Sequence, residues 1–99
     1  MARFNVLPRK GRNVLVVDCQ ADGLRQLPTR FVVPLLDPDR VPSPIGRLNP
    51  ILDVAGRPML LATHLAAAVP VSSLGRSIVS LADEHHRIID ALDFLLAGF

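Results

Sequence analysis

The segment from Ser80 to Phe99 constrains the fold most strongly, because its apolar residues follow the period of an amphipathic helix. Steps of four and three place them on one stripe: Leu81, His85, Ile88, Leu92, Leu95 and Phe99, widened by Ile89 and Leu96. The opposite side carries polar or small residues: Asp83, His86, Asp90, Asp93 and Ala97. Ser80 is expected to cap the helix start, where the negative charges of Asp83 and Glu84 are also favourable. The stripe predicts a helix that packs on a second layer.

The end of this helix, Ala97-Gly98-Phe99, is apolar, although chain ends are usually polar and frayed. Two interpretations remain open. Phe99 packs into the core, as aromatic residues commonly do, or the helix tip is presented to a partner.

The residues before the helix predict short strands separated by turns. We expect strands at Arg3–Leu7, Val14–Cys19, Thr29–Leu36, Ile51–Val54, Arg57–Thr63, Val69–Val71 and Arg76–Ser80. The first two form a hairpin around a basic turn, and the fourth and fifth form another around Ala55-Gly56. Pro34 lacks an N–H and marks an edge, bulge or bend. Short strands followed by one helix predict a single α+β domain over residues 1–99, with the helix on an antiparallel sheet.

Composition narrows the possible functions. The chain has 99 residues, a formal charge of +2, four Phe and no Trp or Tyr, so base-stacking surfaces and direct nucleic-acid binding are not expected. Its apolar runs are too short to span a bilayer, and we expect a cytoplasmic protein without membrane contact. A hydrophobic share of 49% in so short a chain favours a dimer interface.

No pattern predicts catalysis. In the cluster of His85, His86 and Asp90, only His86 and Asp90 share a helix face, and no obvious third ligand lies beside them, so no metal and no cofactor are expected. Cys19 is expected to be a buried, inert thiol. The stretch Asp37–Pro50 is the longest loop, with four prolines, and long loops tend to be functional or mobile.

Several segments, taken in order, resemble the CcdB family of toxins. They are Phe4-Asn-Val6, Val17-Asp-Cys-Gln-Ala-Asp22, Thr29-Arg-Phe-Val-Val-Pro-Leu35, Arg47-Leu-Asn-Pro50, Met59-Leu-Leu-Ala-Thr63, Val69-Pro-Val-Ser-Ser-Leu-Gly75 and the closing Ala-Gly-Phe. Each motif is weak alone. Together they cover essentially the whole chain at the family's spacing.

The resemblance implies an SH3-like small antiparallel β-barrel with an accessory sheet and a C-terminal α-helix, assembled as a homodimer. It implies a toxin of a type II toxin–antitoxin module rather than an enzyme. Such toxins bind the DNA gyrase A subunit and trap the gyrase–DNA cleavage complex, and a CcdA-like antitoxin neutralises them.

The family's gyrase contacts carry over onto Leu24 in the turn after the second strand and onto Asp93, Ala97, Gly98 and Phe99 at the helix end. The antitoxin surface cannot be carried over residue by residue, and the loop Asp37–Gly46 is our candidate. This chain departs from the pattern at three positions. Ala97 stands where a well-known member has Trp, Phe99 replaces a terminal Ile, and Gly23 replaces a larger side chain.

Two alternatives remain. One is a MazF/Kid-like endoribonuclease on the same fold, for which Asp22, Arg30 and His64 are the available groups. The other is a degenerate, non-toxic dimeric interaction domain.

Overall fold

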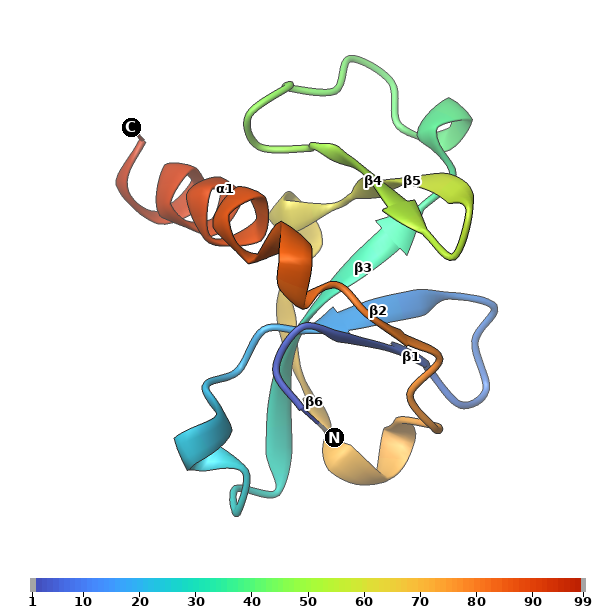
Figure 1. Cartoon of the computed structure of the whole chain (residues 1–99), viewed down its shortest axis with the longest axis vertical. Helices are drawn as coiled ribbons and strands as arrows, with labels where there is room; N and C mark the ends of the chain where they lie inside the picture. The colour runs from blue at the N-terminus through green and yellow to red at the C-terminus, as the bar shows by residue number, and fades with distance from the viewer. Residues whose placement is uncertain (1, 99) are drawn as a thin grey trace.

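The computed structural model describes residues 2–98, and within them the strands form a seven-stranded antiparallel sheet that curves into a nearly closed barrel (Figure 1). The strands are β1 (Asn5–Pro8), β2 (Leu15–Asp18), β3 (Thr29–Leu36), β4 (Ile51–Val54), β5 (Arg57–Leu61), β6 (Ala67–Pro70) and β7 (Val79–Ser80). The helix α1 (His85–Ala97) follows at the C-terminal end. This confirms the α+β domain predicted from the residue pattern and the SH3-like barrel that the family resemblance implies.

The sheet forks at β3, because Pro34 interrupts one edge of this strand. Residues 29–32 of β3 pair with β6, whereas Leu35 and Leu36 pair with β5. Between these two partners the chain forms the 3-10 turn η3 (Thr63–Leu65), and the Pro34 carbonyl accepts a hydrogen bond from Ala62 N. Pro34 therefore marks the expected bend, and the β4–β5 branch takes the place of the accessory sheet.

The predicted hairpins are both present, with small differences in strand length. The strands β1 and β2 pair through Val6–Val17, and β4 and β5 pair through Leu52–Met59. Ala55 and Gly56 both have positive φ, 53° and 85°, as a tight two-residue hairpin turn requires. The strands β3 and β4 have the predicted bounds, whereas β7 is only two residues long.

Two apolar layers lie on the two faces of the sheet. The larger one fills the space between the sheet and α1, which contributes Ile88, Ala91 and Leu92. The smaller one consists of Leu7, Val16, Val32, Val69 and Leu74. Because β3 supplies residues to both layers in alternation, it is the central strand of the fold.

The helix differs from its prediction at both ends. It begins at His85, after the 3-10 turn η5 (Ala82–Glu84), and the Ser80 hydroxyl accepts a hydrogen bond from Ala82 N instead of capping α1 directly. His85 is exposed, and the apolar stripe is covered only as far as Leu92. Leu95 is 39% exposed and Leu96 is 81% exposed. The last turn of α1 extends past the edge of the sheet (Figure 1), and it carries these two exposed side chains.

A buried ion pair joins β2 to β3. Arg30 Nε and Nη2 donate to the same oxygen of Asp18, Oδ2, at 2.9 and 2.6 Å, and the two side chains are 2% and 0% exposed. The other oxygen, Asp18 Oδ1, accepts from Gln20 N at 3.1 Å. Both carboxylate oxygens therefore have partners, which offsets the desolvation of the charge.

We predict that Arg30→Ala lowers the free energy of unfolding by about 3–5 kcal/mol, because it leaves the Asp18 carboxylate buried without its cation. The measurement is urea unfolding at fixed protein concentration. The control is Arg57→Ala, which breaks the exposed pair with Asp37 and should cost under about 1 kcal/mol. Equal losses in the two variants would contradict the importance of the buried pair.

Candidate functional site

The C-terminal end of α1 forms a well-defined tip. Gly98 adopts a left-handed conformation with φ of 81°, and its N–H donates to the Phe94 carbonyl at 2.9 Å, which ends the helix. Asp93, Ala97 and Gly98 are exposed, whereas Phe99 lies outside the described residues. Four of the five residues carried over from the family, counting Leu24, are therefore exposed.

Leu96 belongs to the same tip, although the sequence analysis assigned it to the core-facing stripe. It follows Asp93 by three residues, so the two side chains lie on one face of the helix. At 81% exposed, it is the most exposed of the large apolar side chains among residues 2–98. In the sequence, the i,i+3 spacing from Asp93 indicates that Leu96 lies at the tip. The apolar helical period alone places it on the core-facing stripe instead. We call Asp93, Leu96, Ala97 and Gly98 the helix-tip surface.

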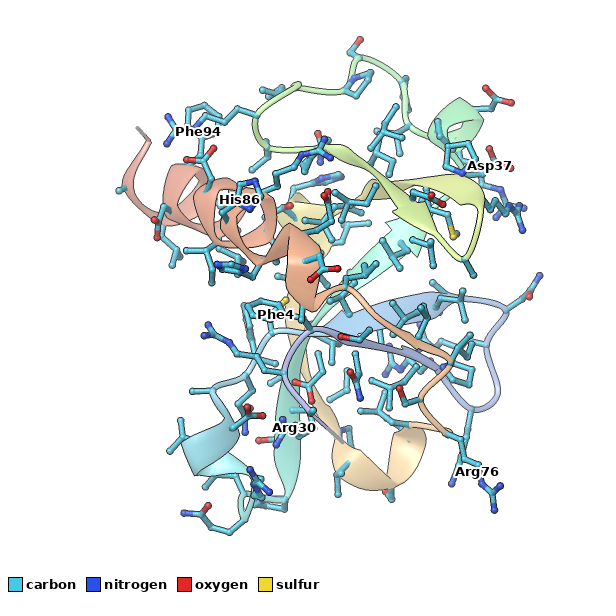
Figure 2. All side chains as sticks on the ribbon, viewed as in Figure 1. Phe4, Arg30, Asp37, Arg76, His86 and Phe94 are labelled. Atoms are coloured by element: carbon cyan, nitrogen blue, oxygen red, sulfur yellow. The ribbon has the colours of Figure 1, made fainter. Side chains whose placement is uncertain are left out.

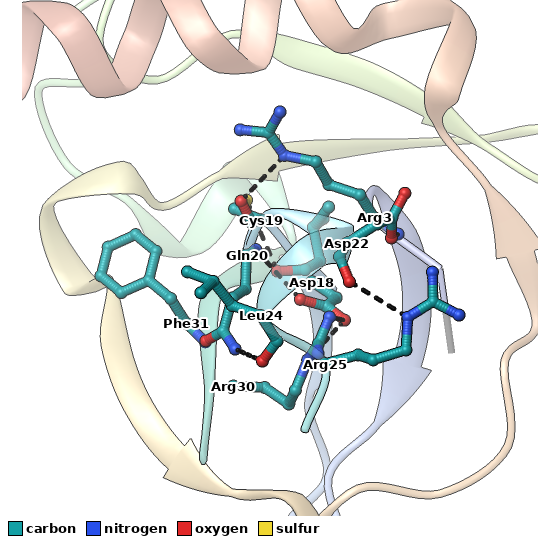
Figure 3. A network of polar contacts seen from close by, with 10 residues as sticks. Arg3, Asp18, Cys19, Gln20, Asp22, Leu24, Arg25, Arg30 and Phe31 are labelled. Atoms are coloured by element: carbon teal, nitrogen blue, oxygen red, sulfur yellow. Dashed lines mark hydrogen bonds and ion pairs between the residues drawn. The ribbon is translucent and has the colours of Figure 1, made fainter. Parts of the chain in front are cut away.

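The turn that carries Leu24 is a second exposed apolar feature. Leu24 ends the 3-10 turn η1 (Asp22–Leu24) and is 47% exposed. The Asp22 carboxylate accepts a hydrogen bond from Arg3 N at 2.9 Å, and Arg25 Nε donates to the Asp22 carbonyl (Figure 3). Figure 1 shows η1 at the lower left and the end of α1 at the upper left, and within residues 2–98 no hydrogen bond or ion pair joins them.

The loop between β3 and β4 is attached to α1 just before the helix-tip surface. Arg47 Nε and Nη2 donate to the two oxygens of Asp90 at 3.0 and 2.8 Å. The Arg47 guanidinium also lies 5.0 Å from the centroid of the Phe94 ring, on the side of α1 that faces the loop (Figure 2). The hydrogen bond from Arg47 lowers the pKa of Asp90 and raises that of Arg47. The pair is exposed to solvent, so we expect its role to lie in placing the loop rather than in stability.

A pocket of about 370 Å³ lies between the β1–β2 turn and this loop. Three arginines line it, Arg12, Arg40 and Arg57, together with Asp37. Arg57 Nη2 lies 3.6 Å from Asp37 Oδ2. With three cations and one carboxylate, the pocket is basic and suited to an acidic ligand.

The cysteine and histidine side chains, which could react or bind a metal, are not arranged for catalysis within residues 2–98. Cys19 is buried, and burial, assisted by the charge of Asp18, raises the pKa of its thiol to about 12, although Arg3 opposes the shift. His64 Nδ1 lies 3.2 Å from Asn49 Nδ2. His86 is exposed on α1 (Figure 2), and residues 2–98 contain no group of three or more His, Cys, Asp or Glu placed to hold a metal. Nor is any helix in this range long and apolar enough to cross a bilayer.

Fold and sequence comparison agree on the class of protein. A nearly closed antiparallel barrel with a C-terminal helix is an SH3-like fold, and a family model described as CcdB protein matches residues 3–98. The chain therefore belongs to the CcdB family. This membership supports its assignment as the toxin of a toxin–antitoxin module. A search of curated proteins gave no match.

We predict that Cys19 of the native protein does not react with a thiol reagent such as DTNB at pH 8. A thiol with a pKa of about 12 is ionised to only about one part in ten thousand at that pH. The absorbance of the released thiolate measures the reaction. In urea the thiol should regain a pKa near its usual ~8.5 and react fully. Rapid reaction of the folded protein would show that Cys19 is accessible.

Proposed function

We propose that this chain is a gyrase poison: its helix-tip surface binds the DNA gyrase A subunit and traps the gyrase–DNA complex with the DNA cleaved. The observation that carries the proposal is the exposure of Leu96 at the end of a capped helix. An apolar side chain so exposed on a rigid element suits an anchor for a protein partner. The contact is binding only, without chemistry on the nucleic acid.

The proposed binding surface combines the helix tip with the turn that carries Leu24. In the homodimer that the family implies, each protomer supplies one copy of both. Leu96 compensates in part for the absent aromatic ring at Ala97, because it offers apolar surface one residue earlier on the tip. Phe99, three residues after Leu96 in the sequence, remains a proposed contact.

For the antitoxin, we propose a surface that includes the loop Asp37–Gly46 and the adjoining basic pocket. Arg12, Arg40 and Arg57 favour an acidic segment of a CcdA-like antitoxin. Arg47 attaches the far end of the β3–β4 loop to α1, whereas Asp37 and the basic pocket that it lines lie on the opposite side of the view from Phe94 (Figure 2). The proposal takes residues 1–99 as one cytoplasmic toxin domain.

The endoribonuclease alternative is not favoured by the geometry of its three available groups. Arg30 is 2% exposed and bound to Asp18, so it is not free to contact a phosphate. Asp22 accepts the hydrogen bond from Arg3 N, and His64 contacts Asn49. We therefore expect the purified protein to leave RNA intact. Catalysed cleavage of a labelled transcript, lost in Asp22→Asn and His64→Ala, would favour the enzyme.

The test of the proposed function is a gyrase assay with the purified protein, supercoiled plasmid and ATP. We expect protein-linked linear DNA after detergent and protease treatment, in amounts that rise with toxin concentration. Clean binding to the gyrase A subunit without cleavage would point to a weakened toxin. The absence of binding would overturn the proposal.

We predict that Leu96→Ser weakens binding to the gyrase A subunit by tenfold or more and leaves the melting temperature nearly unchanged, because Leu96 contributes little to the core. The matched control is Ile78→Ser, which removes a 54% exposed apolar side chain outside the proposed surface. Binding and melting are measured on the same preparations. A large drop in melting temperature, or equal effects of the two variants, would contradict the role of Leu96.

Deleting Gly98 and Phe99 tests the rest of the tip. We expect toxicity in cells to be lost while the dimer and its melting temperature persist. Unfolding of the truncated chain would instead place Phe99 in the core.

A further inference from the structure

The side-chain amide of Gln20 joins the Leu24 turn to the sheet. Gln20 Oε1 accepts a hydrogen bond from Phe31 N on β3 at 3.0 Å, and Gln20 Nε2 donates to the Leu24 carbonyl at 3.0 Å (Figure 3). A backbone N–H only donates and a carbonyl only accepts, so these two partners fix which end of the amide points to each. No other residue type of this length supplies both groups.

Gln20 is itself held from the core side. Its backbone N–H donates to Asp18 Oδ1, and the other oxygen of that carboxylate binds the buried Arg30. The backbone of Cys19 also pairs with β3, through Cys19 N and the Phe31 carbonyl at 2.9 Å. A continuous set of hydrogen bonds therefore runs from the buried ion pair, through Gln20, to the carbonyl of Leu24 (Figure 3).

The turn has few other attachments. None of residues 22–24 is buried, and the hydrogen bonds within the turn are local: Leu24 N to the Ala21 carbonyl and Leu27 N to the Leu24 carbonyl. The bond from Arg3 N to Asp22 holds its first residue. The Gln20 bond holds its last residue, which is the one whose side chain is exposed at 47%. A short turn without buried side chains depends on such bonds for its order.

We propose that Gln20 is a positioning residue for target binding, which holds Leu24 in its binding conformation without contacting the target. The inference rests on the proposed function, because Leu24 is a gyrase contact only if the chain binds gyrase. Without Gln20 the turn samples other conformations. The apparent affinity then falls in proportion to the population that remains competent to bind.

The test variant is Gln20→Met, which keeps the length and neutrality of the side chain and removes both hydrogen bonds. The matched control is Gln26→Met in the same segment. Gln26 is exposed, and its side chain makes no hydrogen bond within residues 2–98. We expect Gln20→Met to weaken binding of the homodimer to the gyrase A subunit about tenfold. The amide hydrogens of Leu24, Leu27 and Phe31, the β3 residue that loses its bond to Gln20, should exchange faster, and the other β2 and β3 amides should be unchanged. Gln26→Met should change neither quantity more than twofold.

A double-mutant cycle separates positioning from general destabilisation. If Gln20 acts through Leu24, Gln20→Met should weaken binding less than twofold in a chain that already carries Leu24→Ala. Unchanged turn exchange or unchanged affinity in Gln20→Met would overturn this inference while leaving the gyrase proposal intact. Independent effects in the cycle would also overturn it. A wild-type chain that does not bind gyrase would overturn both proposals.

Discussion

The ion pair between Asp18 and Arg30 is the interaction on which the rest of the structure depends. It lies at the end of β2 and near the start of β3, where both side chains are excluded from water. An unpaired charge there would be strongly destabilising. The ion pair therefore favours the pairing of β2 with β3 in the one register that brings Asp18 to Arg30. From this point Asp18 also fixes Gln20, and through Gln20 the turn after β2. The carboxylate of Asp18 therefore serves both the buried ion pair and the turn that exposes Leu24.

A second constraint is the forked pairing of β3. Because Pro34 cannot donate a backbone hydrogen bond, the strand changes partner there from β6 to β5, and the sheet opens into two branches. The helix packs over the larger apolar layer on one face of this forked sheet, and its last turn extends past the covered region. The tip carries exposed apolar surface because the helix is longer than the part of the sheet that covers it.

The sequence predicted the features that depend on local pattern. The bounds of β3, the two hairpins and the polar side of α1 follow from β-branched runs, turn residues and helical period, and the structure confirms them. The exposure of Leu95 and Leu96 was not predictable this way, since a period identifies a stripe but not how far the opposing sheet reaches. The burial of Arg30 was missed because arginines are seldom buried without a partner, and Asp18 is twelve residues away in sequence. The link from Gln20 to Leu24 spans only four residues, but its anchor on β3, Phe31 N, is eleven residues from Gln20, so no local pattern indicated it.

The last turn of α1 has a negative electrostatic potential as well as an apolar surface. It carries no basic side chain, and the carboxylate of Asp93 lies beside the end of the helix, where the aligned peptide dipoles already give a negative potential. Arg47, whose guanidinium lies over the Phe94 ring, is held by Asp90. A partner with a basic rim around an apolar recess would therefore be drawn to this end of the molecule, and salt would slow their encounter. The negative potential would speed the approach of such a partner, and contact with Leu96 would slow its dissociation.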